Sequence, residues 1–148
     1  MIKNTLVIKK EFGISKRALF DAWSKPEIMR QWFFAGKKGD NYCTVESQFV
    51  TNGKYKIVMF FNNQGEDQSS AEHFGEYTEI TRYNTIVFTW NNELVSNAVV
   101  KLYFKELSAN KSELTLEHSL FPTQEIMQLH NTGWDACLTN LETFANNN

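Results

Sequence analysis

The three histidines are the residues best suited to acid–base chemistry, and they lie far apart along the chain. His73, His118 and His130 follow no His-Glu-x-x-His or other metal-ligand spacing. We therefore expect no metal and no cofactor. His118 falls in an otherwise apolar strand row, which makes it the best candidate for a polar contact or a general acid/base, although we favour a hydrogen-bonded structural role for it.

Two further residues complete a weak set of catalytic candidates. Glu79 could be an inward carboxylate that acts as a base, and Tyr77 lies two residues before it. The sequence has no nucleophile elbow, no phosphate-binding glycine loop and no paired carboxylates. An enzyme would need at least two polar side chains to converge, chosen from His118, Glu79, Tyr77 and His73. We therefore favour a protein without catalytic activity and keep an enzyme as an alternative.

Aromatic residues are frequent, with twelve Phe, five Tyr and four Trp among 148 residues. Ligand cavities are mostly apolar with a few polar groups, but buried cores have the same composition, so both roles stay open for these rings. The candidate ligand-binding residues are Trp32, Phe33, Met59, Phe61, Tyr77, Phe88, Trp90, Leu102, His118, Leu129 and Trp134.

Charge and composition argue against several partners. The net charge is −2, and the chain has no basic run suited to nucleic acid or to a membrane surface. We expect no signal peptide and no membrane span, because no apolar stretch approaches about 18 residues. Cys43 and Cys137 lie too far apart for a metal-binding pair, and we expect two buried free thiols in the cytoplasm.

The sequence patterns also predict the elements that position these side chains. A strand over residues 5–12 precedes a short helix capped by Ser15 and a second that begins at Pro26. After Gly36 and Gly39 the pattern alternates, with turns such as those at residues 52–53 and 62–65. The predicted strands are 42–49, 54–61, 72–81, 85–91, 98–107 and 113–120. From Pro122 onward a 3.6-residue period predicts a long helix.

Alternation assigns one row of each strand to the inner face of the sheet. The predicted inner residues are Tyr55, Ile57, Met59, Phe61, Ile86, Phe88, Trp90, Val100, Leu102, Phe104, Leu114, Leu116, His118 and Leu120. The strand 72–81 has no clean apolar row, and a bulge near Gly75 could swap its faces. On the long helix, Gly133 is expected to let the helix approach the sheet and so bury Trp134.

The element order predicts one α+β domain over residues 1–148. It consists of a strand, two short helices, six strands and a closing helix, with a curved antiparallel sheet around an internal cavity.

At several places the chain resembles a known family. The similar segments are 20–27 followed by Trp32-Phe33, 53–55, 75–80, 86–90 and Gly133-Trp134. They resemble bacterial stand-alone relatives of the C-terminal domain of the heat-shock-protein-90 ATPase activator, within the START and birch-pollen-allergen-like (SRPBCC) superfamily. The resemblance implies a helix-grip fold of order β-α-α-β6-α with a seven-stranded sheet, and it implies less about activity.

Three functions remain open after this resemblance. We favour binding of a hydrophobic or aromatic small molecule, lipid or polyketide-like, with a possible part in stress response. A polyketide-cyclase or hydrolase-like enzyme is the first alternative. The second is a chaperone-regulating interaction module, which would need an exposed apolar patch near Val58, Phe60 and Tyr103. A homodimer through the phenylalanine-rich sheet edges is also possible.

Overall fold

The structure is a computed structural model that describes residues 5–34, 41–61 and 69–147. Its elements are β1 (Leu6–Phe12), α1 (Lys16–Ser24), α2 (Pro26–Trp32), β2 (Asn41–Ser47), β3 (Lys54–Phe61), β4 (Ser69–Thr81), β5 (Thr85–Trp90), β6 (Ala98–Ser108), β7 (Lys111–Ser119) and α3 (Gln124–Asn146). This order confirms the predicted fold class. The expected turn at residues 62–65 and the glycines Gly36 and Gly39 lie outside the described residues.

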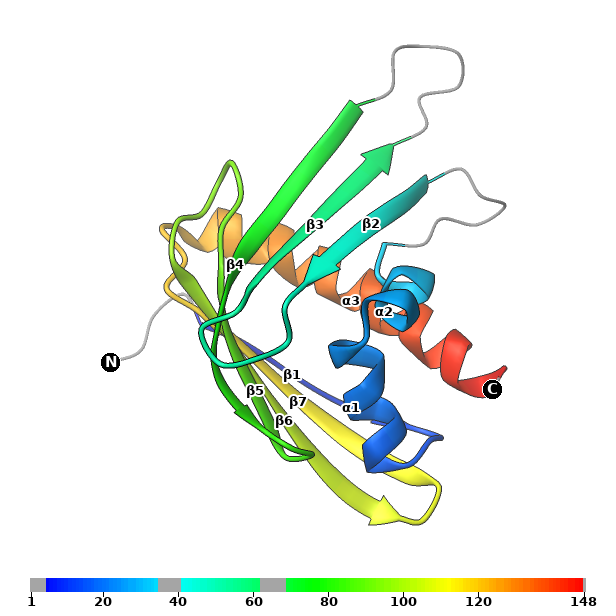
Figure 1. The fold of residues 1–148 in the computed structure, drawn as a ribbon. Coiled ribbons are helices and arrows are strands. Elements are labelled where there is room, and N and C mark those ends of the chain that lie inside the picture. The colour runs from blue at the N-terminus through cyan, green and yellow to red at the C-terminus, as the bar shows by residue number, and fades with distance from the viewer. Residues whose placement is uncertain (1–4, 35–40, 62–68, 148) are drawn as a thin grey trace.

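All seven strands form one antiparallel sheet in the order β1-β7-β6-β5-β4-β3-β2. The sheet curls around α3, and the three helices lie on its concave side (Figure 1). Helix α1 packs on β6 and β7, whereas α2 packs on β2 and α3. The two short helices therefore close one end of the space between the sheet and α3.

Side-chain caps fix where the helices begin. The Ser15 hydroxyl accepts a hydrogen bond from the backbone N–H of Ala18 at 3.1 Å, and Thr123 accepts one from Ile126 at 3.1 Å. Pro26 occupies the first turn of α2, where its missing N–H costs no hydrogen bond. Both short helices therefore start where the sequence predicts, and α3 starts two residues after Pro122.

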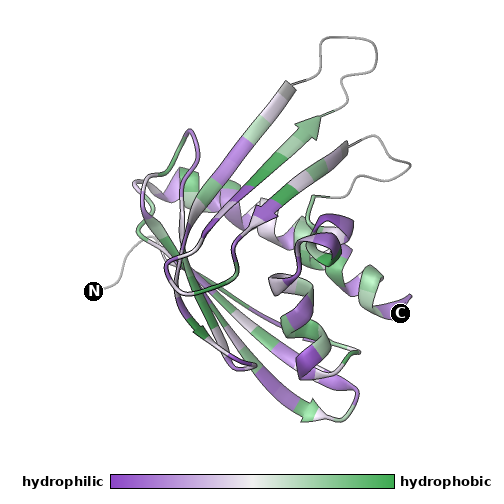
Figure 2. Cartoon of the chain, viewed as in Figure 1, coloured by the Kyte–Doolittle hydropathy of each residue, from purple (hydrophilic) through white to green (hydrophobic). Residues whose placement is uncertain are grey.

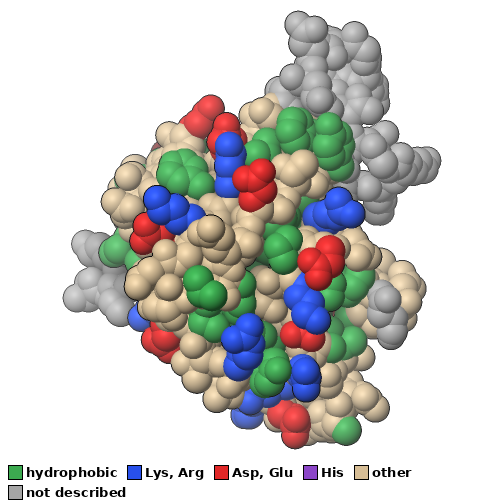
Figure 3. All heavy atoms as spheres, in the orientation of Figure 1, with side chains coloured by type: hydrophobic (Ala, Val, Ile, Leu, Met, Phe, Trp, Pro, Cys, Tyr) green, Lys and Arg blue, Asp and Glu red, His purple; other side chains and the backbone are tan. Residues whose placement is uncertain are grey.

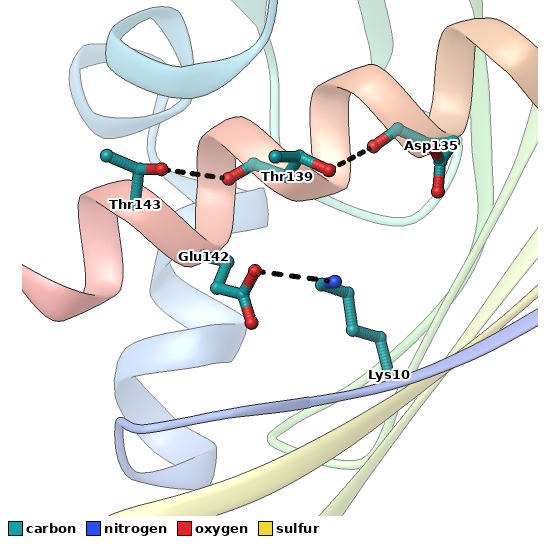
Figure 4. A network of polar contacts seen from close by, with 5 residues as sticks. All are labelled: Lys10, Asp135, Thr139, Glu142 and Thr143. Atoms are coloured by element: carbon teal, nitrogen blue, oxygen red, sulfur yellow. Dashed lines mark hydrogen bonds and ion pairs between the residues drawn. The ribbon is translucent and has the colours of Figure 1, made fainter.

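The solvent-facing side of α3 has its own polar contacts (Figure 4). The hydroxyl of Thr139 donates to the carbonyl of Asp135 at 2.9 Å, and that of Thr143 donates to the carbonyl of Thr139 at 3.2 Å. Lys10 of β1 and Glu142 form an ion pair at 3.5 Å. This pair links α3 to the edge strand, although exposed pairs contribute little to stability. No helix within the described ranges is both long and apolar enough to cross a bilayer.

The predicted inner rows are buried in β5 and β6, and polar and apolar residues alternate along the strands (Figure 2). One assignment was wrong: Leu120 is 63% exposed. Leu120 directly follows the last residue of β7, and its φ of 68° lies in the left-handed region. The alternation therefore stops there, and Phe121 is buried instead.

Strand β4 switches faces later than predicted. Its register to β5 shifts between Tyr77 and Glu79, so the bulge does not lie at Gly75. Gly75 has a different role, because a Cβ there would lie 2.0 Å from the carbonyl oxygen of Thr89. It lets β4 and β5 approach closely. After the bulge Glu79 is exposed, so it is not an inward carboxylate.

Candidate functional site: an apolar cavity

A cavity of about 350 Å³ lies between β3, β4, β5 and the N-terminal half of α3. Its aromatic lining consists of Phe33, Phe34, Phe61, Trp90 and Trp134. Its other apolar residues are Met59, Ala71, Leu94, Leu129 and Cys137, and its polar ones are His73, Asn92 and His130. Among the described residues, none that lines the cavity carries a formal charge at neutral pH.

Six of the candidate ligand-binding residues line this cavity: Phe33, Met59, Phe61, Trp90, Leu129 and Trp134. Leu129 is 61% exposed and therefore lies at the cavity mouth. Phe34 also lines the cavity, and its φ of 55° is unusual for a bulky residue. Such a conformation costs of order 1–3 kcal/mol and is found most often at functional sites. The Phe34 ring meets Phe61 edge-on at 4.9 Å.

The other five candidates lie elsewhere. Tyr77, Phe88 and Leu102 surround a second, nearly filled void of about 10 Å³. Trp32 is fully buried beside α1, and its indole N–H donates to the Ala22 carbonyl at 3.1 Å. His118 is also fully buried, and it lies behind Trp134.

Gly133 has a role that the sequence did not reveal. We expected its missing side chain to let α3 approach the sheet. Instead, a Cβ at this position would meet no atom within 4 Å, and Gly133 lines the cavity. Glycine within a helix costs about 1 kcal/mol relative to alanine. The residue thus adds no side chain to the cavity wall, at an exposed position of α3. Trp134 itself is buried, as predicted.

The three histidines, which no spacing connects in the sequence, meet around Trp90. The imidazole of His73 stacks on the Trp90 ring at 4.7 Å, and those of His118 and His130 meet it edge-on at 5.7 and 6.4 Å. The indole N–H of Trp134 donates to Nδ1 of His118 at 2.9 Å. No group of His, Cys, Asp and Glu in the described residues is arranged to hold a metal ion.

Burial keeps these histidines neutral at physiological pH. It lowers the pKa of His73 to about 4 and that of His118 to about 3, and in both cases the neighbouring His130 lowers the pKa further. The pKa of His130 is also lowered, mainly by burial. Neutral imidazoles can donate and accept hydrogen bonds without bringing a charge into the apolar cavity.

Asn92 joins two of the histidines and was not among the candidates from the sequence. Its side-chain nitrogen lies 3.2 Å from Nδ1 of His73 and 3.0 Å from Nε2 of His130. In the sequence, Asn91-Asn92 has only the features of a turn. Only the fold brings this amide next to the two rings.

The catalytic candidates do not converge. Glu79 is exposed, and the hydroxyl of Tyr77 bonds with that of Ser47 at 2.8 Å, away from the cavity. His118 is enclosed behind Trp134, which leaves His73 as the only one of the four that lines the cavity.

The two thiols are both buried, as expected, and are poor nucleophiles. Burial raises the pKa of Cys43 to about 11 and that of Cys137 to about 12. Both therefore remain protonated at neutral pH. Cys137 lines the cavity as an apolar residue, and Cys43 donates to the Phe33 carbonyl at 2.8 Å.

A long helix held by a curled seven-stranded antiparallel sheet, with a cavity between them, defines the helix-grip class of α+β proteins. Within this class, the chain belongs to the family described as Activator of Hsp90 ATPase homolog 1-like protein. The family's profile matches residues 14–146.

Solved structures share the fold at low sequence identity. A protein from Chromobacterium violaceum has 18% identity and a TM-score of 0.79, and the match covers 96% of this chain and 97% of that one. One from Staphylococcus epidermidis has 22% identity, a TM-score of 0.76 and coverage of 99% and 92%. An HSP90 activator from Plasmodium falciparum has 19% identity, a TM-score of 0.70 and coverage of 95% and 94%. No curated protein matches the sequence.

Proposed function

We propose that the protein binds a neutral, largely apolar small molecule in the cavity beside Gly133, and that it does so in the cytoplasm. The observation that carries this proposal is a void of about 350 Å³ with apolar walls. Its polar cluster consists of His73, Asn92 and His130. Protein interiors contain few voids larger than a water molecule, whereas pockets for small molecules begin at roughly 300 Å³. The size and lining suit a lipid-like or polyketide-like ligand.

Two features favour binding over catalysis. Among the described residues the cavity has no carboxylate or ammonium group, and Asn92 already bonds with both histidines that line it. The cyclase or hydrolase alternative called for two convergent groups from the four candidates, which supply only His73. The polar residues that do converge there, His73, Asn92 and His130, are hydrogen-bonded to one another through Asn92. We therefore place catalysis second.

The interaction-module alternative has less support. Phe60 on β3 stacks with Tyr42 on β2 at 4.8 Å, but Tyr103 lies on β6, with β4 and β5 between them. Figure 3 shows charged side chains interspersed with the apolar ones over this side of the molecule. The expected patch of Val58, Phe60 and Tyr103 is therefore divided.

Intrinsic tryptophan fluorescence tests the proposal, because Trp90 and Trp134 both line the cavity. Neutral aromatics, long-chain alcohols and polyketide-like compounds would be titrated into the wild type, Gly133→Leu and Gly133→Ala. The leucine fills the cavity from α3, and the alanine controls for the gain in helix propensity. We expect affinities tighter than millimolar for the wild type and the alanine variant. The leucine variant should bind at least about tenfold more weakly, a difference of about 1.4 kcal/mol.

Two results would argue against a ligand site. One is that no compound binds more tightly than millimolar, and the other is that Gly133→Leu binds as well as Gly133→Ala. Native mass spectrometry of freshly purified protein would add a direct search for a co-purifying molecule.

A further inference from the structure

We propose that the cavity recognises its ligand through one hydrogen-bond donor, the Nε2–H group of His73. The ligand class is then a neutral apolar molecule with an acceptor oxygen, such as a ketone, ester or ether, directed at this nitrogen. This inference rests on the proposed function and specifies the chemistry of the ligand.

The first step is the orientation of the Asn92 amide. Its side-chain oxygen accepts two backbone N–H groups, from Leu94 at 2.8 Å and from Val95 at 3.0 Å. If the amide were flipped, its NH₂ group would face these two donors. The orientation is therefore fixed, and the NH₂ group faces the histidines.

The second step follows from that NH₂ group, which can only donate. Nδ1 of His73 and Nε2 of His130 must therefore both accept, so neither nitrogen carries a proton. Nδ1 of His130 lies 2.9 Å from the Ile126 carbonyl and donates to it. Both nitrogens of His130 are thus already bonded.

The third step leaves His73 with an available donor. A neutral imidazole carries one proton, and since Nδ1 accepts, the proton is on Nε2. No group in the described ranges accepts a hydrogen bond from Nε2. The ring is held in place by its stacking on Trp90 and by its bond to Asn92.

Other donors near the cavity are already bonded or out of reach. The indole N–H of Trp134 donates to His118, and that of Trp90 is buried below the cavity surface. Only the weak S–H group of Cys137 remains. Each side-chain acceptor of the polar cluster is also in use. A ligand hydroxyl or amine would therefore find no side-chain partner in this cluster for its own proton, and such a mismatch costs affinity.

The first experiment determines the tautomers without any ligand. Long-range ¹H–¹⁵N spectra of the wild-type protein, labelled at histidine, distinguish protonated from unprotonated ring nitrogens. At neutral pH we expect His73 protonated at Nε2 and His130 at Nδ1. A proton on Nδ1 of His73 would overturn the inference, whatever the protein binds.

The second experiment compares two probes of nearly the same shape, 2-acetylnaphthalene and 2-isopropenylnaphthalene. Only the ketone can accept a hydrogen bond. Each Kd would be measured for the wild type and for His73→Phe, which keeps an aromatic ring beside Trp90. The two probes differ in their free energy of transfer from water, but this difference is the same for both proteins. It therefore cancels when the ratio of the two Kd values is compared between the wild type and the variant. We expect the preference for the ketone to fall about fivefold in the variant, as for one neutral hydrogen bond.

The outcomes separate this inference from the proposed function. An unchanged ratio with both probes still bound would overturn the role of His73 and leave the ligand cavity standing. If neither these probes nor any compound of the wider panel binds to the wild type, both fail. Continued binding of the hydrocarbon to His73→Phe would show that the variant is folded.

Discussion

The space between the sheet and α3 has two halves that differ in packing although both are rich in aromatic residues. The half beside β3, β4 and Gly133 contains a void of about 350 Å³, whereas the half beneath α1 and α2 contains about 10 Å³. Trp134 separates them, since its ring lies 5.2 Å from Trp90 on one side and 5.9 Å from Trp23 on the other. Aromatic content therefore does not decide where a cavity forms.

The covering helix makes the difference. Helix α1 inserts Phe20 and Trp23 into the closed half, where the Phe20 ring lies 5.1 Å from Phe104. Over the open half, α3 presents Gly133 and the exposed Leu129. Under the proposed function, a ligand takes the place in the open half that α1 side chains occupy in the closed one.

Removing the dividing ring should have the largest effect. Trp134→Ala should lower the free energy of unfolding by about 3–5 kcal/mol, because it joins the void to the packed half and removes a buried ring. It also removes the donor to His118. Trp134→Phe keeps a ring and should cost less. Urea unfolding measures both, and a loss under about 1 kcal/mol for the alanine variant would contradict this placement.

Lowering the pH should have the next largest effect on the free energy of unfolding, through the histidines around the open half. Burial holds the pKa of His73 and of His118 below the 6.5 of an unfolded chain, so the unfolded state binds protons first as the pH falls. The free energy of unfolding is then highest above about pH 6.5 and declines as the pH falls toward 4. One pKa unit corresponds to about 1.4 kcal/mol, so His73 alone could account for roughly 3 kcal/mol.

Urea unfolding at several pH values from 7 to 4 would measure this loss. His73→Gln, which can still accept from Asn92, should show a shallower dependence on pH. Equal slopes for the variant and the wild type would show that His73 does not titrate in this way.

Enlarging a side chain in the closed half should reduce stability but leave binding intact. Phe88→Trp adds volume beside a void of only about 10 Å³ and should cost about 1–3 kcal/mol. Its affinity for a cavity ligand should stay within about twofold of the wild type. Loss of binding in this folded variant would mean that the two halves are not separate.

The smallest effect is expected at Gly133. Gly133→Ala should stabilise the protein by up to about 1 kcal/mol, because the added Cβ meets no atom and alanine is the better helix former. Thermal unfolding would reveal the shift. Destabilisation instead would contradict the open space around a Cβ at this residue.

Local patterns predicted most of the fold. Alternation placed β3 with its bounds at Lys54 and Phe61, and Ser15 and Pro26 marked the starts of α1 and α2. Predictions failed where a single backbone conformation interrupts the pattern, as at the left-handed Leu120 and at the bulge after Tyr77. Neither leucine nor tyrosine is a residue type that predicts a left-handed conformation or a bulge.

The cavity was harder to predict than the fold. Trp90 could be chosen by inward parity, but the same parity chose Phe88 and Leu102 of the closed half. Parity assigns a face of the sheet and says nothing about which helix covers it. Asn92 lies in a loop, and its contacts with His73 and His130 span 19 and 38 residues, so no local signal predicts them.

The indole N–H signals of the four tryptophans test the central claim most directly. Trp90 and Trp134 line the open half, Trp23 lines the closed half, and Trp32 packs against Trp23 at 4.8 Å. Titration of 2-acetylnaphthalene into ¹⁵N-labelled protein, with signals assigned by single Trp→Phe variants, would follow all four. The account predicts saturable shifts that are largest for Trp90 and Trp134. Shifts largest at Trp23 and Trp32, or no saturable shift at any indole, would contradict it.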